Sequence, residues 1–116
     1  MNRSLASKRR GRLLRRELSR IVRNITRRYR PEKIFLFGSL ARGEVSAWSD
    51  IDLAVVKDTR KRFLDRIGDV LLCADPKVGL DAVVYTPQEI ERLEHSGHYF
   101  WTEEIKNHGK LLYQRP

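Results

Sequence analysis

Two short stretches of the chain carry the residue types that handle phosphates and divalent cations. Gly38 and Ser39 follow an apolar run, and Asp50 and Asp52 flank the first residue of the next one. A glycine lets a phosphate approach the backbone, and a serine adds a hydroxyl donor. Strand alternation would place both aspartates on one face, where two carboxylates repel each other unless a cation such as Mg²⁺ lies between them. These residues predict a site for a phosphate-bearing ligand and a divalent metal.

A third carboxylate, Asp81, interrupts the otherwise apolar residues 80–84. A carboxylate within a strand that looks buried needs a partner. If its strand lies beside that of Asp52, Asp81 completes a three-carboxylate cluster that could hold two metal ions. Each feature also has an ordinary structural explanation: a strand-to-helix turn at Gly38, a turn cap at Asp50, an exposed edge at Asp52 and a salt bridge at Asp81.

The elements that would position these residues follow from the spacing of apolar side chains. Alternating helical and strand spacing predicts an α/β domain of short strands and helices. We expect strands at 33–37, 51–56 and 80–85, a helical turn after 38, helices at 60–73, from about 87, and at 99–107, and an edge strand at 111–113. Thr86 and Glu89 form a capping-box pattern, and Gly109 is expected to end the last helix. Tyr99, Phe100 and Trp101 are expected to pack that helix.

The amino-terminal segment is amphipathic and strongly basic. Apolar residues from Leu14 to Tyr29 recur at helical spacing, and the helix should end before Pro31, with Gly11 separating it from a frayed start. Residues 1–30 hold twelve Lys or Arg and one Glu, a formal charge of +11, whereas residues 31–116 carry −2. The excess charge therefore belongs to one helix, which could be a nucleic-acid arm or simply a solvated helix back.

Length and composition limit the remaining possibilities. The 116 residues form one compact domain, in which we expect a basic helix at 1–30 and the main domain at 31–116. The single cysteine, Cys73, cannot form an internal disulfide, and no long apolar stretch could cross a bilayer. We therefore expect a cytoplasmic protein. His95 and His98 are expected to be exposed loop residues rather than metal ligands.

Together, the Gly-Ser and Asp-x-Asp motifs resemble those of the DNA polymerase beta nucleotidyltransferase superfamily. The similarity spans about residues 31–113 and is greatest to the minimal nucleotidyltransferases, which are often antitoxins paired with HEPN-domain ribonucleases. It implies a small mixed β-sheet flanked by helices. The basic helix before residue 31 is more arginine-rich than this resemblance explains.

The resemblance also implies a role for each site residue. Gly38, Ser39 and Ser49 would bind the nucleotide phosphates, and Asp50 and Asp52 would bind two Mg²⁺ ions. Asp81 would be the third carboxylate, on the side of the attacking group. A further residue, Arg42, could clamp the triphosphate, although an ion pair with the nearby Glu44 is an alternative.

The implied reaction is Mg²⁺-dependent transfer of a nucleoside monophosphate, with AMP from ATP as the expected donor, to an acceptor hydroxyl. A single small domain has little room for a walled acceptor pocket, so we expect a second macromolecule to present the acceptor. The resemblance implies a HEPN protein whose tyrosine is adenylylated, which would silence a toxin. The alternatives are a non-catalytic antitoxin that neutralises its partner by occlusion, or a nucleic-acid-binding accessory protein.

Overall fold

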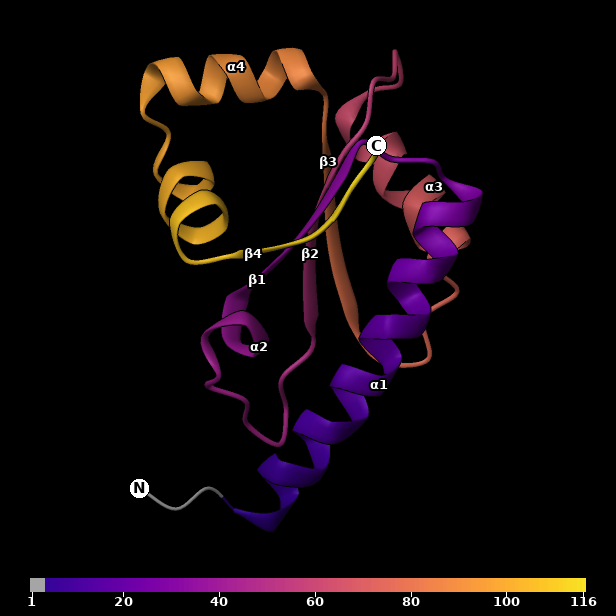
Figure 1. Cartoon of the computed structure of the whole chain (residues 1–116), viewed down its shortest axis with the longest axis vertical. Helices are drawn as coiled ribbons and strands as arrows, with labels where there is room; N and C mark the ends of the chain where they lie inside the picture. The colour runs from indigo at the N-terminus through magenta and orange to yellow at the C-terminus, as the bar shows by residue number, and fades with distance from the viewer. Residues whose placement is uncertain (1–3) are drawn as a thin grey trace.

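The computed structural model describes residues 4–116, in which helices alternate with strands along most of the chain (Figure 1). In chain order the elements are α1 (Leu5–Arg28), β1 (Lys33–Phe37), α2 (Gly38–Arg42), β2 (Ile51–Val56), α3 (Phe63–Ala74), β3 (Leu80–Tyr85), α4 (Pro87–Ser96), the π-helix η1 (Phe100–Asn107) and β4 (Lys110–Gln114). The predicted strands and the order of the helices are confirmed. The predicted capping box is also confirmed, because Thr86 and Glu89 each accept a hydrogen bond from the backbone of the other.

The four strands form one mixed sheet in the order β3-β2-β1-β4. β1 pairs antiparallel with both β2 and β4, whereas β2 and β3 run parallel and are joined through α3. Phe37 therefore lies opposite Asp52, and Asp52 lies opposite Asp81. This topology brings the end of β1 and the starts of β2 and β3 to the same edge of the sheet. The expected mixed α/β architecture is confirmed.

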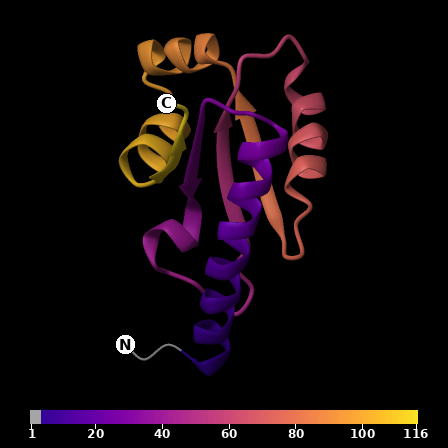
Figure 2. The same ribbon diagram turned by 45° about the vertical axis from the view of Figure 1, so that its right-hand side comes forward.

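Helices cover both faces of the sheet (Figures 1 and 2). α1 and α3 pack on one face, where Ile21 and Val70 meet inward side chains such as Leu53. η1 and α4 cover the other face, where Trp101 and Ile105 pack on the smaller cluster around Ala54. Alternation along β2 therefore points Leu53 and Asp52 to opposite faces. Within residues 4–116, no helix is both long and apolar enough to cross a membrane.

The helices differ from the sequence prediction in some details, and α3 begins at Phe63 rather than at residue 60. α1 begins at Leu5 with Ser4 as its N-cap and runs through Gly11 without a break. A glycine inside a helix costs only about 1 kcal/mol, and Gly11 is buried in the structure, so packing overrides its intrinsic preference. In the last helix Trp101 is buried as expected, but the side chain of Tyr99 is 71% exposed because it precedes the packed turn.

Gly109 allows a close approach of two backbone segments rather than capping the helix. η1 ends with His108 as its cap, one residue earlier than predicted. A Cβ atom on Gly109 would lie 2.3 Å from the Ile105 carbonyl oxygen and 2.8 Å from that of Leu36. Only glycine fits here, and it lets the chain turn directly from η1 into β4.

Candidate active site

The turn between β1 and α2 is built around the carboxylate of Asp52. Gly38 adopts the left-handed conformation, with φ of 77°. A Cβ atom at this position would lie 2.2 Å from Oδ2 of Asp52, so a side chain would displace the carboxylate. Gly38 is therefore required both for its backbone conformation and for the close contact with Asp52.

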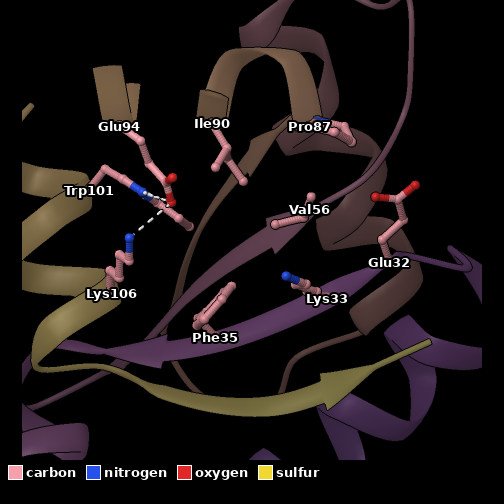
Figure 3. Close-up of a pocket in the computed structure, with 9 residues that line it drawn as sticks. All are labelled: Glu32, Lys33, Phe35, Val56, Pro87, Ile90, Glu94, Trp101 and Lys106. Atoms are coloured by element: carbon pink, nitrogen blue, oxygen red, sulfur yellow. Dashed lines mark hydrogen bonds and ion pairs between the residues drawn. The ribbon is translucent and has the colours of Figure 1, made fainter. Parts of the chain in front are cut away.

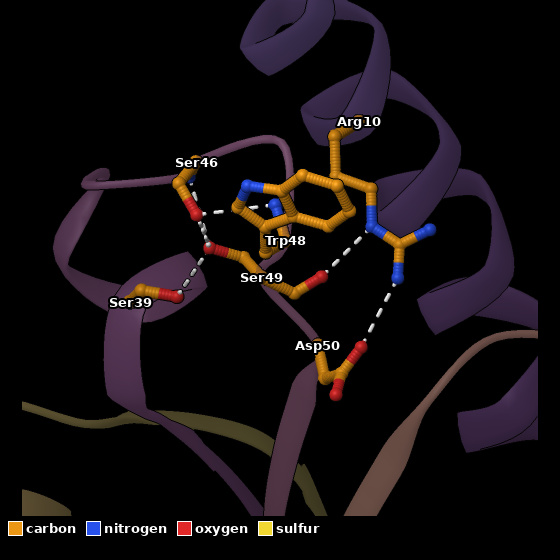
Figure 4. Close-up of polar contacts among 6 residues, drawn as sticks. All are labelled: Arg10, Ser39, Ser46, Trp48, Ser49 and Asp50. Carbon is orange, nitrogen blue, oxygen red and sulfur yellow. Dashed lines mark hydrogen bonds and ion pairs between the residues drawn. The ribbon is translucent and has the colours of Figure 1, made fainter.

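A hydroxyl network connects this turn to the loop before β2 (Figure 4). The Ser39 hydroxyl donates a 3.1 Å hydrogen bond to Oγ of Ser49, and Ser49 Oγ also accepts a 2.9 Å bond from the backbone N–H of Ser46. The structure thus brings Ser39 and Ser49 together, beside the turn that holds Asp52. Their predicted contact with nucleotide phosphates stays a prediction.

Asp52 and Asp81 face each other across the parallel pair β2 and β3. Burial first of all, and then the neighbouring negative charges of Asp81 and Asp50, together raise the pKa of Asp52 to about 6. This half-buried acid beside two other carboxylates is the kind of arrangement that a divalent cation stabilises, because the cation removes the repulsion.

Asp50 has an ion-pair partner that the sequence prediction did not include. Its Oδ1 accepts a 3.1 Å ion-paired hydrogen bond from Arg10 of α1, whose Nε also donates to the Ser49 carbonyl at 2.8 Å (Figure 4). The carboxylate lies against Gly79, where a Cβ atom would approach Oδ1 to 2.3 Å. Across residues 4–116, no three Asp, Glu, His or Cys side chains are grouped so that they could hold a metal ion. The strand register thus brings Asp52 and Asp81 together, whereas Asp50 pairs with Arg10.

Asp50 lies one residue before β2, which begins at Ile51. Outside the strand the backbone no longer fixes the side-chain direction. The side chain of Asp50 is 45% exposed and that of Arg10 is 23% exposed, so the pair lies at the rim of the site rather than in the core. Solvent access leaves room for either group to change its partner.

Arg42 lies at the end of α2 and forms the ion pair with Glu44 that the sequence analysis gave as the alternative to a phosphate clamp. Its guanidinium pairs with Glu44 at 3.2 Å and with Glu104 of η1 at 2.9 Å. Its positive charge partly opposes the rise in the pKa of Asp52, so Arg42 lies within electrostatic reach of that carboxylate. A role as a triphosphate clamp stays a prediction, and it would require Arg42 to exchange these partners.

Sequence reasoning missed two residues that border the site. Nothing in the spacing of the chain links Arg10 to Asp50, which lies forty positions away. Trp48 was passed over as part of a polar turn, yet its side chain is 88% exposed beside the serine network (Figure 4). A tryptophan among the polar residues of a short turn is unusual, and this was the signal that the sequence offered.

A separate hollow of about 260 Å³ lies between the sheet, α4 and η1 (Figure 3). Its lining includes Phe35, Ile90 and Trp101, and none of the predicted site residues. Glu94 already accepts a hydrogen bond from the Trp101 indole and pairs with Lys106, both at 3.3 Å. The hollow is thus distinct from the carboxylate site, and its Glu94 is already engaged by Trp101 and Lys106.

The sequence profile of the family "Polymerase beta, Nucleotidyltransferase" matches residues 20–116, most of the chain. The chain belongs to this nucleotidyltransferase family. Its domain therefore supports nucleotidyl transfer as the general activity, and the β1–α2 turn with the β2 and β3 carboxylates is its candidate active site.

The structure of this nucleotidyltransferase is similar to a crystal structure from Sulfolobus solfataricus of a protein assigned as a nucleotidyltransferase. The TM-score is 0.70 at 20% sequence identity, and the match covers 99% of this chain and 93% of the other. At this identity the similarity establishes the polymerase beta-like fold. No curated protein matches the chain significantly.

Proposed function

We propose that this chain is a Mg²⁺-dependent nucleotidyltransferase that transfers AMP from ATP to a tyrosine hydroxyl of a HEPN-domain ribonuclease and thereby acts as its antitoxin. In this reaction the acceptor oxygen bonds to the α-phosphorus of ATP, the bond from that phosphorus to the bridging oxygen breaks, and pyrophosphate leaves. The hydroxyl proton is released. The observation that supports this proposal best is the facing pair Asp52 and Asp81 beside the Gly38 turn, in a chain of this family.

The carboxylates fit a magnesium ion by their chemistry. Mg²⁺ commonly binds one or two carboxylates and completes its coordination with waters and substrate phosphates. Asp52 and Asp81 would supply these ligands, and the raised pKa of Asp52 shows that its charge is poorly compensated by the protein itself. Asp50 could become a third ligand only if its ion pair with Arg10 were broken. When bound, Mg²⁺ would neutralise the charge that develops on the transferred and leaving phosphates.

The remaining site residues would position the nucleotide. Ser39 and Ser49 offer hydroxyls next to the carboxylates, and Arg42 offers a guanidinium that matches phosphate geometry. The hollow beside α4 and η1 is lined by none of the site residues, and we infer that the acceptor would be presented by the partner protein. That arrangement supports a macromolecular acceptor over a small metabolite.

The test uses the purified chain, ATP labelled at the α-phosphate, Mg²⁺ and the co-expressed HEPN partner. We expect the label on the partner, removed by substituting Asp52→Asn and retained with Asp58→Asn, an exposed aspartate far from the site. Equal labelling by both variants would contradict the assignment of Asp52. Absence of transfer by the unmodified chain would contradict the enzymatic proposal.

One observation favours a second candidate, a non-catalytic antitoxin that occludes its partner. The ion pair between Arg10 and Asp50 leaves no three-ligand metal cluster in the part of the chain that the structure describes. Neutralisation of the ribonuclease by the double variant Asp50→Ala, Asp52→Ala would support occlusion. Loss of neutralisation in that variant, with binding retained, would support catalysis.

A further inference from the structure

The outer surface of α1 carries a continuous row of arginines, here called the arginine stripe. Its members are Arg9, Arg12, Arg16, Arg20, Arg23 and Arg27. Steps of three or four residues keep them on one helix face, opposite the buried Leu14, Ile21 and Ile25. At 1.5 Å per residue the stripe is about 27 Å long. It starts next to Arg10 at the candidate active site and extends to the far end of the helix.

The stripe is almost uncompensated by acidic groups. Glu17 is the one acidic residue of α1, and it pairs with Arg20 at 2.7 Å, as does Asp75 at 3.9 Å. Among residues 4–116, the other members of the stripe form no ion pair. Like charges at these spacings destabilise an isolated helix, and mixed Glu and Lys would solvate a helix back at lower cost. The row therefore calls for an explanation other than solubility.

The predominance of arginine over lysine in this segment indicates what kind of ligand it would bind. Residues 4–30 contain ten arginines and a single lysine. A guanidinium donates two parallel hydrogen bonds to a phosphate, whereas an ammonium acts as a point charge. No aromatic side chain belongs to the stripe, so it offers phosphate contacts without a platform for base stacking.

At its far end the stripe continues into a basic hollow of about 580 Å³. The hollow is lined by Thr26, Arg27, Arg30, Tyr113 and Arg115, with no acidic side chain among them. Arg115, just after β4, donates a hydrogen bond to the backbone carbonyl of Arg30, which holds the two residues together. Three guanidinium groups from α1, its following turn and the carboxy-terminal segment thus converge on one concave surface.

We propose that the arginine stripe and the basic hollow bind the phosphate backbone of a nucleic acid. The length of the stripe corresponds to about eight phosphates along one strand of a duplex, at 3.4 Å per nucleotide. Recognition would be through charge and guanidinium geometry, and therefore largely independent of base sequence. Within residues 4–116, no arginine of the stripe pairs with Asp50, Asp52 or Asp81, so the proposal goes beyond nucleotidyl transfer and does not depend on it.

The test measures binding of fluorescein-labelled RNA, as a 20-nucleotide single strand and as a duplex, to the full chain by anisotropy over a series of salt concentrations. The stripe variant Arg12→Gln, Arg16→Gln, Arg23→Gln removes three charges from the stripe. The matched control Arg60→Gln, Arg92→Gln, Lys110→Gln removes three exposed charges that form no ion pair. Glutamine keeps helix propensity, and circular dichroism checks that each variant folds.

We expect the unmodified chain and the control to bind with similar salt dependence. The stripe variant should bind at least about tenfold more weakly at moderate salt and lose about three units from the slope of log affinity against log salt. The variant Arg30→Gln, Arg115→Gln should lose about two units. Asp52→Asn should bind RNA like the unmodified chain, which separates this result from any failure of nucleotidyl transfer.

Three outcomes would overturn the proposal. The first is that the unmodified chain does not bind RNA even at low salt. The second is an equal loss in the stripe variant and the control, which would mean that only net charge matters. The third is competition by polyglutamate as effective as that by unlabelled RNA of the same charge, which would point to an acidic protein partner instead.

Discussion

Substituting Asp52→Asn should stabilise the protein at neutral pH while removing its transfer activity. Burial, with help from Asp81 and Asp50, raises the pKa of Asp52 from 3.8 to about 6. The carboxylate is therefore ionised at neutral pH in surroundings that disfavour its charge. An asparagine has nearly the same shape and carries no charge, so it removes this unfavourable interaction and keeps the packing against Gly38.

The size and sign of the change in the free energy of unfolding follow from the raised pKa of Asp52. Raising the pKa of Asp52 from 3.8 to about 6 corresponds to about 3 kcal/mol of unfavourable free energy for the ionised form, at 1.36 kcal/mol per pKa unit. Solvent access to the side chain reduces this to about 1–2 kcal/mol. Because the pKa of this group is raised on folding, its contribution to stability is fully present below about pH 4. The contribution is lost as pH rises to about 6 and beyond. Asp52→Asn should abolish that loss.

The assay is urea denaturation in EDTA at pH 4.0 and pH 7.5. The free energy of unfolding of Asp52→Asn should exceed that of the unmodified chain by about 1–2 kcal/mol at pH 7.5 and by little at pH 4.0. The control Asp58→Asn changes an exposed carboxylate and should show no such difference. A variant less stable than the unmodified chain at pH 7.5, or an equal gain at both pH values, would refute the electrostatic account of the site.

Two further predictions concern the neighbours of these carboxylates. Arg10→Gln removes the ion pair with Asp50, which is worth up to about 1 kcal/mol, so Mn²⁺ used as a probe should bind about fivefold more tightly in a calorimetric titration. Unchanged or weaker binding would show that Asp50 is not a metal ligand. Gly38→Ala should reduce nucleotidyl transfer at least about 100-fold because a Cβ atom displaces Asp52, whereas Gly43→Ala, with a similar φ of 71° and open space around it, should lower stability alone. Equal transfer by the two alanine variants would contradict this reading of the turn.

Those parts of the site that depend on strand geometry were predictable from sequence. Apolar runs located β2 and β3, and the register meets the condition under which Asp81 was predicted to join Asp52, namely that these two strands are neighbours. The Gly38 turn was also placed correctly between a strand and a short helix. These features depend on local pattern and on the period of a strand, both of which can be read directly from the residues.

The contact between Arg10 and Asp50 could not be predicted in this way. It depends on how α1 crosses the sheet, which is set by packing and not by the local sequence. A segment that is frayed up to Gly11 would not hold the side chain of Arg10 in place, so the expected break at Gly11 is also incompatible with this contact. The helix continues to Leu5 because Gly11 is buried against the rest of the protein, and only tertiary structure reveals that.

The negative charges of the three site aspartates are balanced by positive groups to different extents. Arg10 supplies a positive charge to Asp50, whereas Asp52 and Asp81 share no comparable partner, and the raised pKa of Asp52 records the cost. A cation that binds Asp52 and Asp81 recovers free energy that the fold has given up, whereas one that also binds Asp50 must first break an existing ion pair. Metal binding through two carboxylates is therefore favoured over binding through three unless a bound nucleotide offers Arg10 another partner.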